Sequence, residues 1–224
     1  MNRVLLVEDH DSFKESLAIV INGEPDFKVV AQAGSVEETK ALGDIGADVA
    51  LVDLGLPDGD GADVIWHLRE ANPGLKVMIL SASLDRGEIA RAVEAGAAGV
   101  IHKSSSVLDV IDALKRLIAG EVLLPSEEVV DYLRLAGQER ERRHQEELAI
   151  MKLTKREREV LEALAEGLNS KEIAERLSMT IETERTHVVN LLKKLKVHSR
   201  LEAVVFAVRH GVVEIRPLDP DRHY

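Results

Sequence analysis

The sequence predicts an α/β domain over residues 1–120 and a small all-α domain over residues 151–213. Three observations support this division. Five short apolar runs alternate with amphipathic segments up to residue 120, a pattern typical of a parallel sheet whose strands are buried on both faces. From residue 152 onward the pattern is helical only. The charge also changes, because residues 1–120 hold 11 Lys and Arg against 20 Asp and Glu, whereas residues 152–210 hold 12 against 9.

The apolar runs and the amphipathic segments locate the elements of the first domain. Strands are expected near 3–7, 28–33, 48–53, 76–81 and 98–103. Helices are expected near 12–22, 35–43, 61–71, 85–95 and 106–119. Ser35 with Glu38 forms a capping-box pattern, and Gly96 and Gly120 stand where helix C-caps belong. Because crossovers between parallel strands are almost always right-handed, the alternation predicts a doubly wound sheet of the (βα)5 type.

The segment 121–150 is interpreted as a linker that is partly helical. Ser126 can begin a short helix with an apolar face. The run QERERRHQEEL after Gly137 is almost free of apolar residues, which favours an exposed linker helix or a flexible tether. A dimerising helix stays open as a second interpretation, because one helical face carries Val129, Leu133 and Ala136.

The second domain contains only helical signals. Helices are expected at about 155–166, 171–177, 181–196 and 200–210. Thr154 with Glu157, and Ser199 with Glu202, are capping-box patterns. The middle two helices are joined by the short segment SMT, a connection typical of a helix-turn-helix. Residues 214–224 are left as a C-terminal tail.

Polar residues stand at the carboxyl ends of four of the expected strands. Glu8 and Asp9 follow the first strand, Asp53 ends the third, Ser81 ends the fourth and Lys103 ends the fifth. Ligands of such sheets collect at the carboxyl ends of the strands. Converging carboxylates repel one another unless a hard cation such as Mg²⁺ binds them, and a hydroxyl and an ammonium suit phosphoryl oxygens. The pattern predicts an aspartate phosphorylation site with Asp53 as the phosphoacceptor.

Several other classes of protein are excluded by residue type. A calcium loop over LPDGDGADVIWH would need acids where Leu56 and His67 stand. An aspartyl phosphohydrolase would usually carry Asp where Gly55 stands, and no Gly-rich phosphate loop precedes a helix, so the protein is not expected to be an enzyme. The chain has no cysteine. Its first apolar run is too short for a signal peptide or a membrane span, which predicts a soluble, cytoplasmic protein.

These motifs resemble a known family of bacterial proteins. Residues 1–120 resemble the receiver domain of two-component response regulators, and residues 152–213 resemble the LuxR-type helix-turn-helix. Together they are similar to the NarL/FixJ subfamily. The resemblance implies the strand order 2-1-3-4-5, a sensor histidine kinase as phosphoryl donor, double-stranded DNA as partner, and a homodimer controlled by phosphorylation. Two alternatives stay open, namely a phosphorylation-insensitive regulator and a phosphate-relay protein whose output domain does not bind DNA.

The resemblance also assigns roles within the predicted phosphorylation site. It implies that Asp9 and Asp53 hold Mg²⁺ together with the backbone carbonyl of Gly55, while Glu8 acts through water. It further implies that the phosphoryl group is contacted by Ser81, Ala82 and Lys103.

Helix 181–196 is the expected recognition helix. Its basic side chains can reach phosphates or guanine edges, and its hydroxyl and amide side chains can reach phosphate or base. The residues expected to bind DNA are Lys171, Glu182, Thr183, Glu184, Arg185, His187, Asn190, Lys193 and Lys194.

The sequence departs from the family at two places. Receivers commonly carry an aromatic residue three positions before the conserved lysine, and here Val100 stands there. LuxR-type helices usually carry Lys near 182 and Val at 184, whereas this chain has Glu182 and Glu184. Glu184 is expected either to repel DNA phosphates or to accept a hydrogen bond from a cytosine amino group.

Overall fold

The chain forms two compact units. The computed structural model describes residues 1–43, 45–83 and 85–213, so the expected tail at 214–224 lies outside the described residues. The units are Met1–Glu139 and Arg140–Tyr224. The point of division therefore falls within the segment 121–150 that the sequence predicts as a linker.

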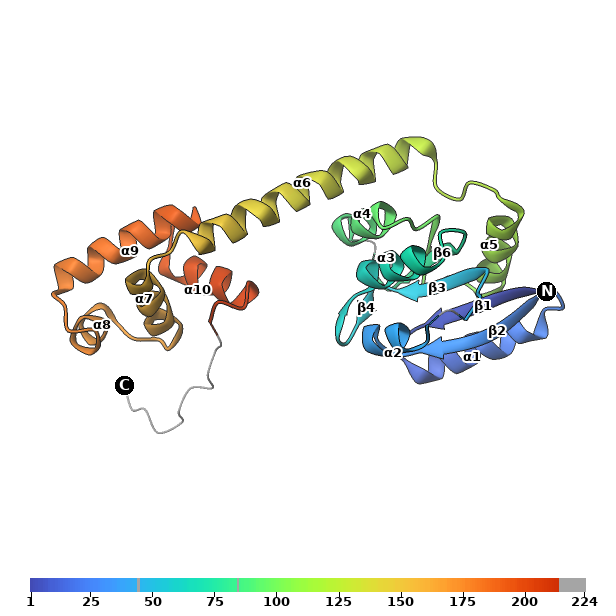
Figure 1. The fold of residues 1–224 in the computed structure, drawn as a ribbon, viewed down its shortest axis with the longest axis horizontal. Coiled ribbons are helices and arrows are strands. Elements are labelled where there is room, and N and C mark those ends of the chain that lie inside the picture. The colour runs from blue at the N-terminus through green and yellow to red at the C-terminus, as the bar shows by residue number, and fades with distance from the viewer. Residues whose placement is uncertain (44, 84, 214–224) are drawn as a thin grey trace. The chain divides into compact units, whose positions relative to one another are not determined.

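A five-stranded parallel sheet forms the centre of the first unit (Figure 1). Its strands are β1 (Asn2–Val7), β2 (Phe27–Ala33), β3 (Val49–Asp53), β6 (Lys76–Ser81) and β7 (Gly99–His102). Their order is β2-β1-β3-β6-β7, which confirms the expected 2-1-3-4-5 arrangement of the five main strands. The sequence did not predict the antiparallel pair β4 (Gly55–Leu56) and β5 (Gly59–Asp60), which follows β3 directly.

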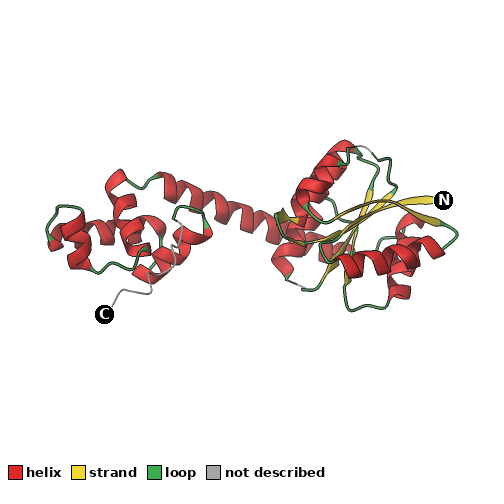
Figure 2. Cartoon of the chain, turned by 90° about the horizontal axis from the view of Figure 1, so that it is seen from below, coloured by secondary structure: helices red, strands yellow, loops and turns green. Residues whose placement is uncertain are grey.

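Helices cover both faces of this sheet, as expected for a doubly wound fold (Figure 2). They are α1 (Asp11–Gly23), α2 (Val36–Ala41), α3 (Gly61–Ala71), α4 (Arg86–Glu94) and α5 (Val107–Ala119). Successive strand residues point to opposite faces. Val4 and Leu6 therefore pack with α1 and α5, whereas Leu5 and Val7 pack with α2, α3 and α4.

The linker segment forms one long helix, α6 (Ser126–Met151), of 26 residues. The sequence predicted a short helix near Ser126, so its length was underestimated. The polar run after Gly137 keeps the helix because Glu, Gln and Arg are good helix formers even where they bury little surface. Val129 packs against α4, but Leu133 is 46 % exposed, so the apolar face proposed for this helix is only partly covered.

The second unit packs four further helices around a single apolar cluster. They are α7 (Lys155–Ala165), α8 (Ser170–Arg176), α9 (Ile181–Leu195) and α10 (Arg200–Arg209). Val188, Leu191 and Leu195 of α9 lie in this cluster with Ile173 of α8, as the helical periodicity predicts. The Thr154 hydroxyl accepts a hydrogen bond from the Glu157 amide, which confirms the capping box that begins α7.

Candidate phosphorylation site and nucleic-acid interface

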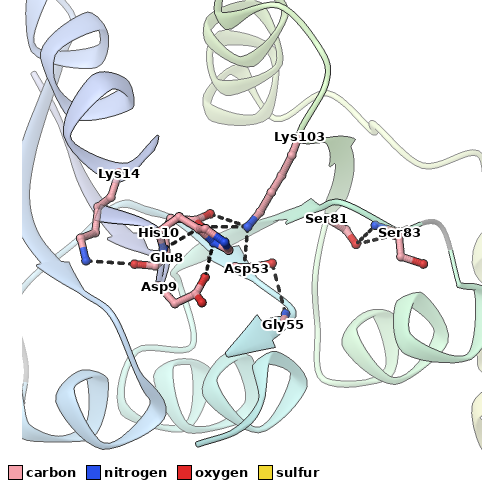
Figure 3. A network of polar contacts seen from close by, with 9 residues as sticks. All are labelled: Glu8, Asp9, His10, Lys14, Asp53, Gly55, Ser81, Ser83 and Lys103. Carbon is pink, nitrogen blue, oxygen red and sulfur yellow. Dashed lines mark hydrogen bonds and ion pairs between the residues drawn. The ribbon is translucent and has the colours of Figure 1, made fainter. Parts of the chain in front are cut away.

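The carboxyl ends of three strands bring acidic residues and one lysine together (Figure 3). Glu8 and Asp9 follow β1, Asp53 ends β3, and Lys103 follows β7. The Lys103 Nζ lies 2.7 Å from Asp53 Oδ2 and 2.8 Å from the Glu8 carboxylate. Because parallel strands end at the same edge of the sheet, residues distant in sequence meet there.

Charge at this site is only partly balanced. Glu8 and Asp53 are 1 % and 4 % exposed, so they face each other with little water to screen them. Burial lowers the pKa of Lys103, but its hydrogen bonds with Asp53 and Glu8 outweigh burial and hold that pKa above its ordinary value. Lys103 therefore stays charged, yet a single ammonium serves several carboxylates. The site keeps an excess of negative charge.

His10 is a member of this site that the sequence analysis missed. Its Nδ1 lies 2.7 Å from Asp9 Oδ1 and 3.1 Å from Glu8 Oε1. Hydrogen bonds with Glu8 and then Asp9 raise the pKa of His10 above its ordinary value. Its position directly after the acidic pair, in the same strand-end loop, is the signal that could have identified it.

The residues present fit a hard divalent cation. Glu8, Asp9, His10 and Asp53 each offer one ligand atom, and these atoms lie within 4.8 Å of one another. Two of the buried carboxylate oxygens have only an ion-pair contact: Glu8 Oε2 lies 2.8 Å from Lys103 Nζ, and Asp9 Oδ1 lies 2.7 Å from His10 Nδ1. Oxygen-rich, under-compensated sites of this kind suit Mg²⁺. The Gly55 amide donates to Asp53 Oδ1 at 3.2 Å, so the backbone expected to supply a further ligand lies beside the cluster.

A hollow of about 500 Å³ opens next to the acidic residues. Phe13, Ala82 and Lys103 line it together with Glu8 and His10. Ala82 is thus placed where the sequence expected a phosphoryl contact. The Nε2 atom of His102 lies 3.0 Å from the Ala82 carbonyl oxygen.

Ser81 is buried at the end of β6, but its hydroxyl does not point at the acidic residues (Figure 3). It donates to the carbonyl oxygen of Ser83 and accepts from the Ser83 amide at 3.1 Å. The expectation that this hydroxyl is aimed at the phosphoryl position therefore does not hold in this structure. The reason is local, because a serine side chain readily bonds to backbone two residues on.

The second unit presents one face of α9 to solvent. Most of the residues expected to bind DNA are exposed, namely Lys171 of α8 and, on α9, Glu182, Thr183, Arg185, Asn190 and Lys193. His187 is half-buried. Exposed basic, hydroxyl and amide groups on one helix are what contacts to phosphates and base edges require.

Comparisons with known proteins match both units. Residues 4–115 match the response regulator receiver domain, and residues 151–207 match the luxR family of bacterial regulatory proteins. The chain is 35% identical over 217 residues to the transcriptional regulatory protein LiaR of Bacillus subtilis, which covers 95% of this chain and 100% of LiaR. The chain is a transcriptional response regulator of the LuxR family.

Further relatives agree with this assignment. The response regulator protein VraR of Staphylococcus aureus is 31% identical over 213 residues, covering 95% of this response regulator and 99% of VraR. A solved LuxR-family response regulator from Aurantimonas sp. SI85-9A1 has a TM-score of 0.51 at 27% identity, over 62% of this chain and 96% of that chain. The RcsB–DNA complex, at 22% identity and a TM-score of 0.51 over 92% and 98%, shares the fold. Among the described residues of the response regulator, none of the helices combines the length and apolar character needed to cross a membrane.

The expectation that Glu184 of the response regulator faces DNA is wrong. Its side chain is fully buried, and its Oε1 lies 3.0 Å from an amino group of Arg200, which also donates to the Ser170 hydroxyl at 2.9 Å. Position 184 lies one helical turn before Val188 and therefore on the core face of α9. The valine that the family usually carries there was the signal that this position points inward.

Lys194 is also placed differently from the expectation. Its Nζ lies 2.6 Å from Glu157 Oε2 and 3.0 Å from the Lys152 carbonyl oxygen. Its ammonium thus ties α9 to the start of α7 instead of extending into solvent. Its neighbour Lys193 is exposed, so the two adjacent lysines of this response regulator have different surroundings.

Proposed function

We propose that the response regulator is switched by phosphorylation of Asp53 by a sensor histidine kinase. The observation that carries this proposal is the Lys103 ammonium 2.7 Å from a buried Asp53 carboxylate, beside Glu8 and Asp9. A lysine at this distance can neutralise an added phosphoryl oxygen. The hollow lined by Phe13 and Ala82 gives a donor histidine access to the site.

The transfer itself asks for little covalent chemistry from the protein. One Asp53 carboxylate oxygen attacks phosphorus as the P–N bond to the kinase histidine breaks, and the released imidazole nitrogen takes a proton from solvent. Asp9 and Asp53, with Glu8 through water and the Gly55 carbonyl, would hold Mg²⁺, which supplies charge neutralisation for the phosphoryl oxygens. Lys103 moves from sharing carboxylates to pairing with a phosphoryl oxygen. Positioning and charge compensation account for the rest.

We further propose that the second unit binds double-stranded DNA through α9, as a homodimer formed on phosphorylation. Exposed Arg185 and Lys193 suit phosphate contacts, and Thr183 and Asn190 suit phosphate or base contacts. RcsB, which shares the fold, was solved bound to DNA. Dimeric helix-turn-helix proteins read half-sites about one helical turn apart, so pairing strengthens binding. Both partners imply that the protein acts in the cytoplasm.

Labelling by acetyl phosphate tests the phosphoacceptor. The unaltered chain is expected to take up one phosphoryl group in the presence of Mg²⁺ and none after chelation. Asp53→Asn should abolish the labelling, because an amide oxygen is a far weaker nucleophile than a carboxylate. Asp63→Asn is the matched control, since Asp63 is exposed on α3 and the substitution makes the same change in charge.

Sedimentation of the full chain with and without beryllofluoride then tests the dimer. A rise in weight-average mass that Asp53→Asn prevents supports the proposal. Undiminished labelling of Asp53→Asn rejects Asp53 as the acceptor. An unchanged mass in a chain that is labelled rejects the phosphorylation-controlled dimer and favours constitutive regulation.

A further inference from the structure

Arg91 of α4 joins two acidic residues from distant parts of the first unit. Its Nε lies 2.8 Å from Asp60 Oδ2, and a terminal guanidinium nitrogen lies 3.3 Å from Glu139 Oε2. All three side chains are largely covered, with exposed fractions between 21% and 28%. Ion pairs shielded in this way are stronger than surface pairs, and the planar guanidinium can serve two acceptors at once.

Asp60 is tied to the phosphoacceptor through the backbone. It lies in β5, where it pairs with Gly55 of β4. The Gly55 amide in turn donates to the Asp53 carboxylate at 3.2 Å. Asp60 also begins α3, because its side chain accepts from the Ala62 amide at 2.9 Å. A displacement of the backbone beside Asp53 therefore reaches the carboxylate that holds Arg91.

Glu139 belongs to the long helix α6. The first part of α6 packs on α4 through a small apolar cluster that contains Ile89, Val93 and Leu124, with Val129 and Tyr132 against it. The Arg86 guanidinium lies 5.6 Å from the centre of the Tyr132 ring. A Cβ atom added at Gly87 would lie 2.3 Å from Glu139 Oε1, so the Glu139 carboxylate lies directly against α4 at residue 87.

Val100 of β7 packs at the same apolar cluster between α4 and α6. It packs against the cluster of Ile89, Val93 and Leu124, to which α6 contributes Tyr132. The strand position where receivers commonly carry an aromatic residue therefore has no aromatic of its own, and an aromatic ring from α6 packs at this cluster instead. Because Val100 of β7 and Tyr132 of α6 pack against the same cluster, a change in the receiver can reach the helix through it.

We infer that Arg91 is a positioning residue that couples Asp53 to α6 through Asp60 and Glu139. This rests on the proposed phosphorylation of Asp53. A phosphoryl group adds about one unit of negative charge and three acceptor oxygens, which draw Lys103 and the Gly55 backbone toward it. Asp60 moves with β5, Arg91 moves with Asp60, and its contact with Glu139 is lost. The first part of α6 is released from α4.

Hydrogen exchange of the full chain, with and without beryllofluoride and Mg²⁺, tests this coupling. Amides of residues 126–139 are expected to exchange at least about fivefold faster when Asp53 carries the phosphoryl mimic, in line with typical coupling between sites. Glu139→Gln should exchange fast in both conditions, so that the ratio falls close to one. Asp53 should still be labelled by acetyl phosphate in this variant, because Glu139 lies outside the acidic site.

Glu128→Gln is the matched control, since Glu128 is an exposed acid on the same helix and the substitution removes the same charge. It should keep the full response. A labelled, unaltered chain whose α6 exchange is unchanged or slowed overturns the coupling but not the proposed function. An undiminished response in Glu139→Gln also overturns it. A chain that cannot be labelled at Asp53 overturns the proposed function and the coupling together.

Discussion

Both units bury carboxylates, but they compensate them differently. In the receiver, Glu8 and Asp53 share the single ammonium of Lys103. In the output unit, Glu184 has Arg200 and Glu157 has Lys194, one cation for each carboxylate. A pair balanced within the chain holds helices together. In an under-compensated cluster at strand ends, repulsion between the carboxylates lowers stability, and a bound cation or phosphoryl chemistry can relieve it. Perturbed charge clusters mark functional sites for this reason.

The largest effect is expected from removing the shared cation of the receiver. Lys103→Met keeps most of the side-chain volume but leaves two buried carboxylates without their cation. Breaking buried ion pairs in this way costs roughly 3–5 kcal/mol of stability. Because the acidic residues offer converging ligand atoms, added Mg²⁺ should restore at least half of the loss. Thermal melting of the full chain in chelator and in Mg²⁺ measures both quantities.

The two units should differ in whether added Mg²⁺ restores the stability that a variant has lost. If Mg²⁺ stabilises Lys103→Met no more than the unaltered chain, the acidic residues do not form the proposed cation site. If Mg²⁺ also rescues the output-unit variants described below, the effect is non-specific.

The corresponding change in the output unit is Arg200→Ala. It leaves Glu184 buried and unpaired, which should cost roughly 3 kcal/mol, the lower end for a broken buried pair, because Arg200 is 38% exposed and water can approach. Mg²⁺ should not restore this loss. Glu184→Val, in contrast, replaces the buried charge by an apolar side chain and should change stability by about 1 kcal/mol or less, since a buried pair and a well-packed apolar residue are often equivalent.

Calorimetric melting of the two variants decides between these roles. A loss of stability for Glu184→Val as large as that for Arg200→Ala would mean that the Glu184–Arg200 pair stabilises the fold more than an apolar residue at position 184 does. Negligible losses of stability in both variants would mean that the Glu184–Arg200 pair is not buried in solution.

The contrast between the units also explains what could be predicted from the sequence. The receiver site was accessible because strand ends meet at one edge of a parallel sheet, so Glu8, Asp53 and Lys103 could be placed together from their positions alone. Glu184 could not be placed from its own chemistry, since an acidic residue is expected at the surface and a buried one depends on Arg200 in another helix. The direction of the Ser81 hydroxyl was equally inaccessible, because it depends on a backbone bond to Ser83.

The same limit applies to connecting segments. The pair β4–β5 depends on tertiary contacts that leave little local pattern. The full length of α6 depends on helix propensity, which is a weak signal where no apolar periodicity accompanies it. The polar run after Gly137 is compatible with a helix or a tether, because its residues favour a helix but bury little surface. Arg91 carries no local signal either, since its two acceptors lie 31 and 48 residues away in sequence.

A smaller effect is expected from pH in the output unit. Burial raises the pKa of Glu157, but hydrogen bonds from Lys194 and Thr154 outweigh burial and hold that pKa below its ordinary value of 4.5. A carboxyl group with a lowered pKa stabilises the folded state above its unfolded value, and this contribution is lost as the pH falls through the folded value. Near neutral pH, Glu157→Gln should therefore cost about 2 kcal/mol. The difference from the unaltered chain should shrink as the pH falls below 4.5.

Melting curves of both chains over a pH series measure this difference. A gap that stays constant through the acid range would show that Glu157 acts by packing and not by charge. Glu162→Gln provides the control, because Glu162 is exposed on α7 and should give almost no gap at any pH.

The smallest effect concerns DNA, and it separates two neighbouring lysines of one helix. Lys193 is exposed, whereas the Lys194 ammonium is held 2.6 Å from Glu157. Each phosphate contact contributes about one unit to the slope of log affinity against log salt. Lys193→Ala should therefore flatten that slope by roughly one unit on every sequence, while Lys194→Ala should leave it nearly unchanged and lower stability instead. Titration of a duplex at several salt concentrations measures both slopes. Equal flattening by the two variants would mean that Lys194 leaves Glu157 when DNA binds, and the balanced pair would then be a binding element like the cluster of the receiver.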